Sequence, residues 1–326
     1  MADIQLIALI GFLLAAYSIV ANDAIQTLGT FLSSNSHRPW WVLWLFACSV
    51  LVAVFVYGWW ANDGDPAYGR LSKFPEPEGG LSWIHVIPPA IILILTRFGI
   101  PVSTTFLVLT VFAPGNLGQM LIKSLAGYAV AFFVGGLVYI SVARAAERYF
   151  SHTQGKPIPG YWVALQWSST AFLWSQWLMH DLANIFVYLP RTLSFEMMLF
   201  AVGVMLFLHA VIFYRRGGEI QQIVLSKTNT TDIRSATIVD FIYALILLVF
   251  KEWSNMPMST TWVFLGLLAG REMAISWVQS IRPTAATLRL VGGDFAKAAF
   301  GLSISVALAF GLPTIDRWFK SLGLGG

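Results

Sequence analysis

The stretch VANDAIQTLGT, residues 20–30, places an amide and a carboxylic acid directly after an apolar run that looks ready to cross a membrane. A second stretch, GIPVSTTF at residues 99–106, puts a proline and three hydroxyl side chains inside another apolar run. An ionised side chain at mid-membrane costs at least about 2.5 kcal/mol, so ionisable residues there are rare and are functional by default. The two stretches therefore mark the positions at which we look for function.

The composition of the chain is that of an integral membrane protein. Of its 326 residues, 57% are hydrophobic and 11% are charged, and the mean hydropathy is +0.70. Soluble domains carry about 25% charged residues. Apolar runs of about 20 residues suit helices that cross the hydrocarbon, whereas a barrel would show short alternating segments. We therefore expect an all-α polytopic membrane protein, with apolar segments at about 4–20, 40–61, 83–113, 121–143, 160–180, 197–214, 236–250, 257–280 and 296–312.

The charged residues favour contact with membrane lipid and argue against nucleic acid as a partner. The net charge is +4, and Lys and Arg lie largely in short connecting segments such as RAAERYF and YRRGGEI, where they can face an anionic membrane surface. The single cysteine, Cys48, allows no disulfide or cysteine metal site within one chain. Because Asp3 and no Lys or Arg precedes the first apolar run, we expect a retained first helix. The expected location is the plasma (inner) membrane.

Both interruptions recur once, which indicates an internal duplication. The first half holds ANDAIQ and IPVSTTF, and the second half holds MHDLANI and MPMSTTW. Asp23 and Asp181 lie 158 residues apart, and Ser103 and Ser259 lie 156 apart. Duplicated halves with interrupted apolar segments are typical of secondary transporters, and such halves can be parallel or inverted. We expect a first transmembrane repeat at 1–150, a connecting loop at 151–160 and a second repeat at 161–326.

A proline followed by hydroxyl residues is typical of a helix start. Pro101 suits the first helical position because its missing N–H would have no partner there. The free N–H groups and the positive dipole end of the first turn make an anion site, and two such starts facing each other would surround a small oxyanion with donors. The alternative is a kinked helix whose hydroxyls bond to preceding carbonyls. The residues concerned are Pro101, Ser103, Thr104 and Thr105, and in the second half Pro257, Ser259, Thr260 and Thr261.

The two aspartates have a structural and a functional interpretation. Asp23 and Asp181 could cap the helices that follow them. Alternatively, they could bind a sodium ion, carry a coupled proton, or accept a hydrogen bond from a protonated substrate. The amides of Asn22, Gln26 and Asn184 can donate to an anion or accept from a cation.

Other ionisable residues receive weaker expectations. Arg97 and the Lys251–Glu252 pair precede the two prolines, and we expect ion pairs there, with an approach path for anions as the alternative. Arg271 and Glu272 are expected to pair at a membrane interface. Near helix ends we expect Lys123, Asp240, Asp294 and Lys297.

Together, the four motifs closely resemble those of the inorganic phosphate transporter (PiT) family. Its members carry a duplicated GAND-V-A-N-A type signature and a following P-V-S-T-T-H type segment. In the first half, Asn22–Asp23 and Pro101–Thr105 match. In the second half, Asp181, Ala183 and Asn184 match the acidic signature, and Pro257, Ser259, Thr260 and Thr261 match the hydroxyl segment. The resemblance extends over both halves.

The resemblance implies an inverted-repeat fold whose broken or re-entrant helices hold the substrate between the halves. It also implies an anion carried inward with sodium or protons, so that no other cofactor is expected. Asp23 and Asp181 would be the cation-linked acids and tentative sodium ligands. The phosphate contacts that the resemblance implies are Asn22, Ser103, Thr104, Asn184, Ser259 and Thr260; we add Thr105, Thr261, Gln26 and His180 as candidates.

The chain departs from the family pattern at several positions. Val20 replaces a glycine, Gln26 replaces the second asparagine, and His180 replaces the asparagine before Asp181. Phe106 and Trp262 stand where a histidine often follows the threonines. His180 would put a titratable donor beside the anion. Sulfate therefore remains the alternative substrate, since some members of the wider family look like sulfate carriers.

Three classes of function remain at this stage. The first is a cation-coupled transporter of a small oxyanion that works by alternating access; its partners would be phosphate or sulfate, sodium or protons, and lipid, with a homodimer left open. The second is an intramembrane enzyme, which we do not expect because no G-x-S-x-G, H-E-x-x-H or G-x-G-D segment is present. The third is a passive anion channel. Phosphate keeps a proton near neutral pH that a carboxylate can accept, whereas sulfate has none to give.

Overall fold

The computed structural model of the chain describes residues 6–77, 80–152, 158–218, 221–225, 232–253, 257–279 and 283–321. Every regular element within these ranges is helical. Six of the described helical stretches are long and apolar enough to cross a membrane. The expected class, an all-α polytopic integral membrane protein, is confirmed.

The first part of the chain, within the described residues, holds six α-helices and three short turns. In order they are α1 (Leu6–Ile19), the π-helical turn η1 (Val20–Ala24), α2 (Ile25–Ser34), α3 (Trp40–Ala61), the 3₁₀ turn η2 (Arg70–Lys73), α4 (Trp83–Arg97), α5 (Thr104–Phe112), the 3₁₀ turn η3 (Pro114–Asn116) and α6 (Leu117–His152).

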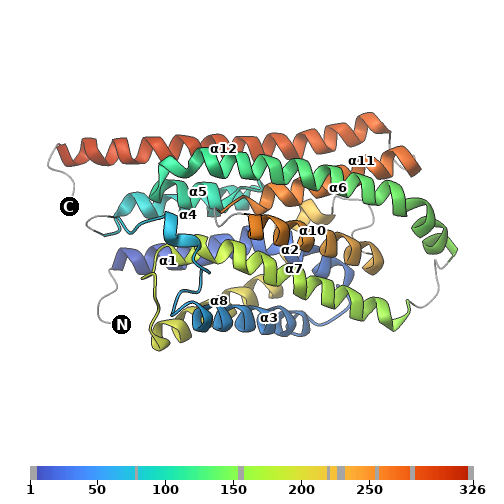
Figure 1. Cartoon of the computed structure of the whole chain (residues 1–326), viewed down its shortest axis with the longest axis horizontal. Coiled ribbons are helices and arrows are strands. Elements are labelled where there is room, and N and C mark those ends of the chain that lie inside the picture. Colours follow the sequence, from blue (N-terminus) through green and yellow to red (C-terminus); the bar gives the residue numbers. More distant parts are fainter. Residues whose placement is uncertain are drawn as a thin grey trace.

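The second part of the chain holds six α-helices within the described residues. Its elements are α7 (Gly160–Phe186), α8 (Phe195–Tyr214), the short α9 (Gln221–Leu225), α10 (Ile233–Trp253), α11 (Thr260–Gln279) and α12 (Thr284–Ser321). In Figure 1, α6, α11 and α12 run together along one side of the molecule, and α3 and α8 form the opposite side. Helices α1, α2, α7 and α10 lie between these two layers.

The hydroxyl motifs break their apolar segments, as predicted. Helix α4 ends at Arg97, and α5 begins at Thr104 after six non-helical residues. At 1.5 Å per residue, α4 and α5 are only about 22 and 14 Å long, and neither can cross a hydrocarbon core of about 30 Å. The expected segment at 83–113 is therefore two short helices joined by a polar turn. In the second half, α10 ends at Trp253 and α11 begins at Thr260, so a break occurs at the matching motif; residues 254–256 lie outside the described ranges.

The two acidic motifs lie within continuous helices, the first as a π turn and the second in regular α-helix. The chain remains helical from Leu6 to Ser34, and Val20–Ala24 form a π turn within it. A π turn admits one extra residue while the backbone N–H groups stay bonded, and such turns occur often at functional sites. In the second half, α7 continues unbroken to Phe186, so Asp181 lies inside a regular helix. Neither aspartate is a helix N-cap.

Helices α6 and α11 pack most closely where both carry glycines. Gly266 and Gly270, spaced as in a GxxxG motif, lie against the backbone of α6. A Cβ on Gly270 would lie 1.9 Å from the carbonyl oxygen of Phe132. Glycine is required there because the two backbones approach closer than any side chain allows. This packing fixes the position of α11, whose first turn belongs to the candidate site.

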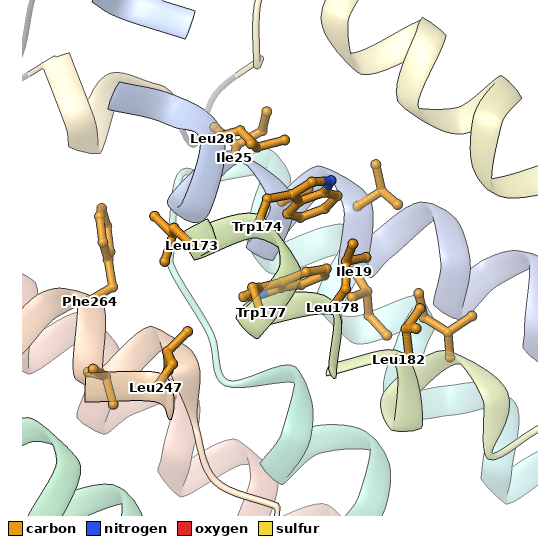
Figure 2. Close-up of a cluster of buried hydrophobic side chains, with 14 of the residues drawn as sticks. Ile19, Ile25, Leu28, Leu173, Trp174, Trp177, Leu178, Leu182, Leu247 and Phe264 are labelled. Atoms are coloured by element: carbon orange, nitrogen blue, oxygen red, sulfur yellow. The ribbon is translucent and has the colours of Figure 1, made fainter. Parts of the chain in front are cut away.

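A cluster of large apolar side chains encloses the acidic motifs. Figure 2 shows apolar residues of α1, α2, α10 and α11 beside those of α7. Trp174 and Trp177 stack with ring centroids 4.8 Å apart, and both are buried. Ile19 and Ile25 flank η1, and Leu182 follows Asp181. The polar groups of the two motifs therefore lie within the apolar interior of the bundle.

Candidate anion site between two helix starts

The π turn η1 presents Asn22 and Asp23 to the start of α5. The Asn22 Nδ2 donates to Asp23 Oδ1 at 2.6 Å and lies 2.7 Å from the carbonyl oxygen of Val102. The Thr104 hydroxyl donates to Asp23 Oδ2. Both Asn22 and Asp23 are buried. The first acidic motif thus meets the first hydroxyl motif, 80 residues further along the chain, inside the protein.

The serines of the two hydroxyl motifs cap the helices that follow them. Ser103 Oγ accepts from the N–H of Phe106 at 3.2 Å, and Ser259 Oγ accepts from the N–H of Trp262 at 3.3 Å. Each cap satisfies one free backbone donor of a first helical turn. The hydroxyl protons of the serines are not used in these two bonds, so both serines can still donate to an anion. Both motifs therefore start helices, as the proline and hydroxyl pattern predicts.

The two helix starts contact each other through reciprocal threonine bonds. Thr105 of α5 donates across to the second half, where the Met258 carbonyl oxygen and Asp181 Oδ1 both lie 3.2 Å from its hydroxyl. Thr261 of α11 makes the matching contacts in the first half: 3.1 Å to the Val102 carbonyl oxygen and 3.5 Å to Asp23 Oδ1. Each threonine thus bonds the acid of the other half.

Asn184 joins the two acids into one network. Its Nδ2 lies 2.7 Å from Asp181 Oδ1 and 3.1 Å from the hydroxyls of both Thr104 and Thr105. Because Thr104 also bonds Asp23, a continuous polar path runs from one carboxylate to the other. Asp181 Oδ2 and Asn184 Oδ1 are buried and have no hydrogen-bond partner among the described residues. They are acceptor atoms available to a cation or to a protonated ligand.

Three further predicted residues, Gln26, His180 and Thr260, lie on the helices that form this network. Gln26 is on α2, one turn after Asn22; it is buried, and neither its Nε2 nor its Oε1 has a partner in the described part of the chain. His180 Nε2 donates to the Leu247 carbonyl oxygen at 2.8 Å, which directs that nitrogen to α10. Its Nδ1 has no partner within the described ranges. Thr260 places its carbonyl oxygen 2.9 Å from the Tyr243 hydroxyl.

Sequence reasoning missed three residues that support or surround the site. The Ser124 hydroxyl on α6 accepts from the backbone N–H of Ser259 at 2.8 Å. Tyr243 on α10 holds the first turn of α11 through Thr260. Arg70, in the loop after α3, is buried within electrostatic range of Asp181. Ser124 and Tyr243 had no distinguishing sequence signal, and Arg70 lies in a loop between the apolar segments, outside the repeated motifs.

The weaker expectations for ionisable residues have mixed outcomes. Lys251 and Glu252 pair at 3.5 Å. Arg271 and Glu272 pair at 2.9 Å, but both are buried, and Arg271 also reaches Ser235 and the ring of Tyr139. This pair is enclosed by protein because α11 packs tightly against α6.

Asp240 is not near a helix end, and that expectation was wrong. It is the eighth residue of α10 and is fully buried. The hydroxyls of Thr30 and Thr170 donate to its two carboxylate oxygens, each at 2.5 Å. Helix packing brings these hydroxyls from α2 and α7, and no local sequence pattern predicts that contact. Lys123 lies less than two turns from the start of α6, as expected, whereas Asp294 and Lys297 lie about three to four turns inside α12.

Arg97 forms no ion pair with any described acidic residue. It lines a pocket of about 370 Å³ together with Arg215, Thr96 and Ala21, the residue before Asn22. The Thr96 hydroxyl in this pocket is buried and has no described partner. The alternative of an approach path for anions is therefore favoured at this position over the expected pairing.

The comparisons with known proteins place the chain by its fold. No protein-family model matches the chain, and no curated protein matches it in sequence. A solved structure described as the sodium-dependent phosphate transporter matches over 98% of this chain and 100% of that one, with a TM-score of 0.63 and 14% sequence identity. The two proteins share one fold. The resemblance that the four motifs indicate is thus confirmed at the level of the fold, over the whole chain.

Proposed function

We propose that the protein is a secondary active transporter of a small inorganic oxyanion, most of all phosphate, coupled to sodium or protons. The observation that carries the proposal is the reciprocal contact of the two helix starts. Thr105 bonds the acid of the second half, and Thr261 bonds the acid of the first. Two positive helix ends, each with hydroxyl side chains, converge where two carboxylates are buried. A site that binds both an anion and a cation would use both kinds of group.

The substrate-binding residues that we propose are those predicted from the motifs. Helix-start hydroxyls and N–H groups would donate to the oxyanion, as helix N-termini do for phosphate in many proteins. The donors are Ser103, Thr104 and Thr105 on α5, with Ser259, Thr260 and Thr261 on α11 and the amides of Asn22, Gln26 and Asn184. His180 keeps a weaker place in this set because its Nε2 is bonded to Leu247.

The coupling cation is proposed to bind at Asp23 and Asp181. A hard cation such as sodium prefers oxygen ligands, by analogy with calcium and magnesium. Carbonyl oxygens of Val102 and Met258 lie beside the two carboxylates, since each accepts from the same threonine that contacts the acid. No cluster of three or more His, Cys, Asp or Glu side chains occurs in the described part of the chain. Backbone carbonyls and hydroxyls would therefore complete the sites.

The arrangement also supports alternating access between two related halves. We infer that residues 1–150 and 161–326 are inverted repeats, because the contacts of Thr105 with the second half correspond to those of Thr261 with the first. The neighbour in fold carries the name of a sodium-dependent phosphate transporter; this supports phosphate and sodium over sulfate and protons. Phosphate is also favoured by the free acceptor Asp181 Oδ2, since only a protonated anion can donate to it.

Reconstituted transport tests the proposal directly. Purified protein in liposomes should take up radiolabelled phosphate when an inward sodium gradient is imposed, with a proton gradient as the second condition. Thr104→Val and Thr260→Val should each reduce kcat/KM by roughly 10-fold or more, because each removes a hydroxyl from a helix start. Thr110→Val is the matched control: its buried hydroxyl bonds the Phe106 carbonyl within α5 and lies away from the site. Saturable sulfate uptake that phosphate cannot compete with would refute the substrate assignment, and flux insensitive to every cation gradient would indicate a channel.

A further inference from the structure

Arg70 is a buried cation that forms no ion pair with the acidic residues in the described part of the chain. It opens η2 in the loop between α3 and α4, and its residue surface is only 2% exposed. No ion pair within 4.0 Å joins it to an acidic group of the described residues. Its Nη1 has no hydrogen-bond partner among those residues. A buried guanidinium usually has its donors satisfied, so this one requires an explanation.

The loop that carries Arg70 is held in place by its own hydrogen bonds. Asp65 accepts from the N–H groups of Ala67 and Gly69 at 2.7 and 2.8 Å. The Tyr68 hydroxyl donates to the Val54 carbonyl at 2.5 Å, which ties the loop to α3. Gly69 has φ = 72°, a left-handed conformation that favours glycine, and it turns the chain just before Arg70. The inward direction of Arg70 is therefore built by its surroundings.

The electrostatic surroundings of Arg70 belong to the second half of the candidate site. Asp181 and Glu252 lie within its range, and so does Lys123, the residue before Ser124. Glu252 is paired with Lys251. Burial lowers the pKa of Arg70 to about 10, against the opposing effect of Asp181, so the side chain is a cation at neutral pH. The turn η2 packs against α7, the helix that carries Asp181. A positive charge with no acidic partner among the described residues thus lies within electrostatic range of Asp181.

We propose that Arg70 is the positive counter-charge of the bound oxyanion and that its guanidinium contacts the anion directly. The inference rests on the proposed function and adds to it a binding residue outside the repeated motifs. Two carboxylates repel an anion, and hydroxyl and amide donors carry no full charge to offset them. A guanidinium supplies that charge and also a planar fork of donors that matches two oxygens of a tetrahedral oxyanion.

A structural role and an anion-binding role for Arg70 predict opposite effects of its removal on the Tm of the ligand-free protein. A structural arginine stabilises the protein, so its removal should lower the Tm. A cation held unpaired for a ligand destabilises the ligand-free protein, and an apolar replacement of similar size should leave the Tm unchanged or raise it. Arg70→Met and Arg70→Lys are the informative variants. Lys73→Met is the matched control, since Lys73 lies in the same turn but is exposed.

The experiment measures thermal unfolding in detergent and uptake in liposomes for the same variants. Wild type should gain Tm with added inorganic phosphate relative to chloride at equal ionic strength. In Arg70→Met this gain should disappear while the ligand-free Tm does not fall, and kcat/KM for phosphate should drop about 10- to 100-fold. Arg70→Lys should retain part of both signals because the charge remains without the fork. Lys73→Met should behave as wild type within about two-fold.

The outcomes separate this inference from the proposed function. Unchanged KM and phosphate stabilisation in Arg70→Met would overturn the role of Arg70 while phosphate transport stands. A lower ligand-free Tm with intact phosphate stabilisation would make Arg70 structural and also overturn it. If wild type responds to sulfate alone and Arg70→Met loses that response, Arg70 keeps its role and the phosphate assignment fails. If no anion stabilises wild type or is taken up, both fail.

Discussion

The glycine contact between α6 and α11 predicts that Gly270→Ala destabilises the protein and disturbs the site. The new Cβ would lie 1.9 Å from the Phe132 carbonyl oxygen, whereas real Cβ contacts are essentially never below 3.0 Å. The helices must therefore separate by at least about 1.1 Å at this crossing, because the contacting atom belongs to backbone and cannot rotate away. The first turn of α11 would move with it, since Ser259 is bonded to Ser124 of α6 at 2.8 Å.

Gly136→Ala provides the control at the same crossing. Its Cβ would lie 3.6 Å from the Gly270 carbonyl oxygen, an ordinary contact. Both variants gain the same preference of alanine for a helix, about 1 kcal/mol over glycine. The difference in the free energy of unfolding between the two variants therefore isolates the cost of overpacking, which is typically about 1–3 kcal/mol. We therefore expect Gly270→Ala to be less stable than Gly136→Ala by about that amount.

The assay is thermal unfolding of both variants in one detergent, followed by phosphate uptake in liposomes. Gly136→Ala should match or exceed the Tm of wild type and transport normally. Gly270→Ala should unfold at a lower temperature and show reduced uptake. Equal Tm values for the two alanine variants would refute the argument that backbone contact at Gly270 positions α11.

Two further predictions concern buried and pocket-lining charges. Asp240→Asn should lower the free energy of unfolding by about 1–3 kcal/mol, because Thr30 and Thr170 each donate to one carboxylate oxygen and an amide offers only one acceptor oxygen. Asp63→Asn, at an exposed turn, is the control. Equal stability of the two variants would contradict the prediction. Combined Arg97→Gln and Arg215→Gln substitutions should slow uptake at low phosphate by about 2- to 10-fold and weaken its dependence on ionic strength, since these residues line the pocket beside Asn22. Arg216→Gln removes the same charge one residue away and should change neither quantity; an unchanged salt dependence in the double variant would argue against the approach path.

The features that sequence predicted correctly are those set by local chemistry. Apolar runs long enough for a bilayer can only be helices, because no water satisfies the backbone there. Helix α5 begins at Thr104 and α11 at Thr260, each behind a serine cap, because proline and hydroxyl residues favour a helix start wherever they occur. The interruption at Asn22 and Asp23 is a π turn, and an isolated polar pair cannot by itself predict that the backbone stays helical there.

The amino-acid sequence was enough to predict the class of the protein, the two pairs of motifs and the residues that carry them. Helix packing determines which of these residues meet. It joins Thr105 to Asp181 and Thr261 to Asp23, across 76 and 238 positions of the chain. It also buries Asp240 between two threonines and brings Arg70 from a loop into electrostatic range of the acid of the second half. Such contacts depend on how helices pack, which is decided by features such as the backbone contact at Gly270, and a linear pattern carries no record of which distant partner a side chain will reach.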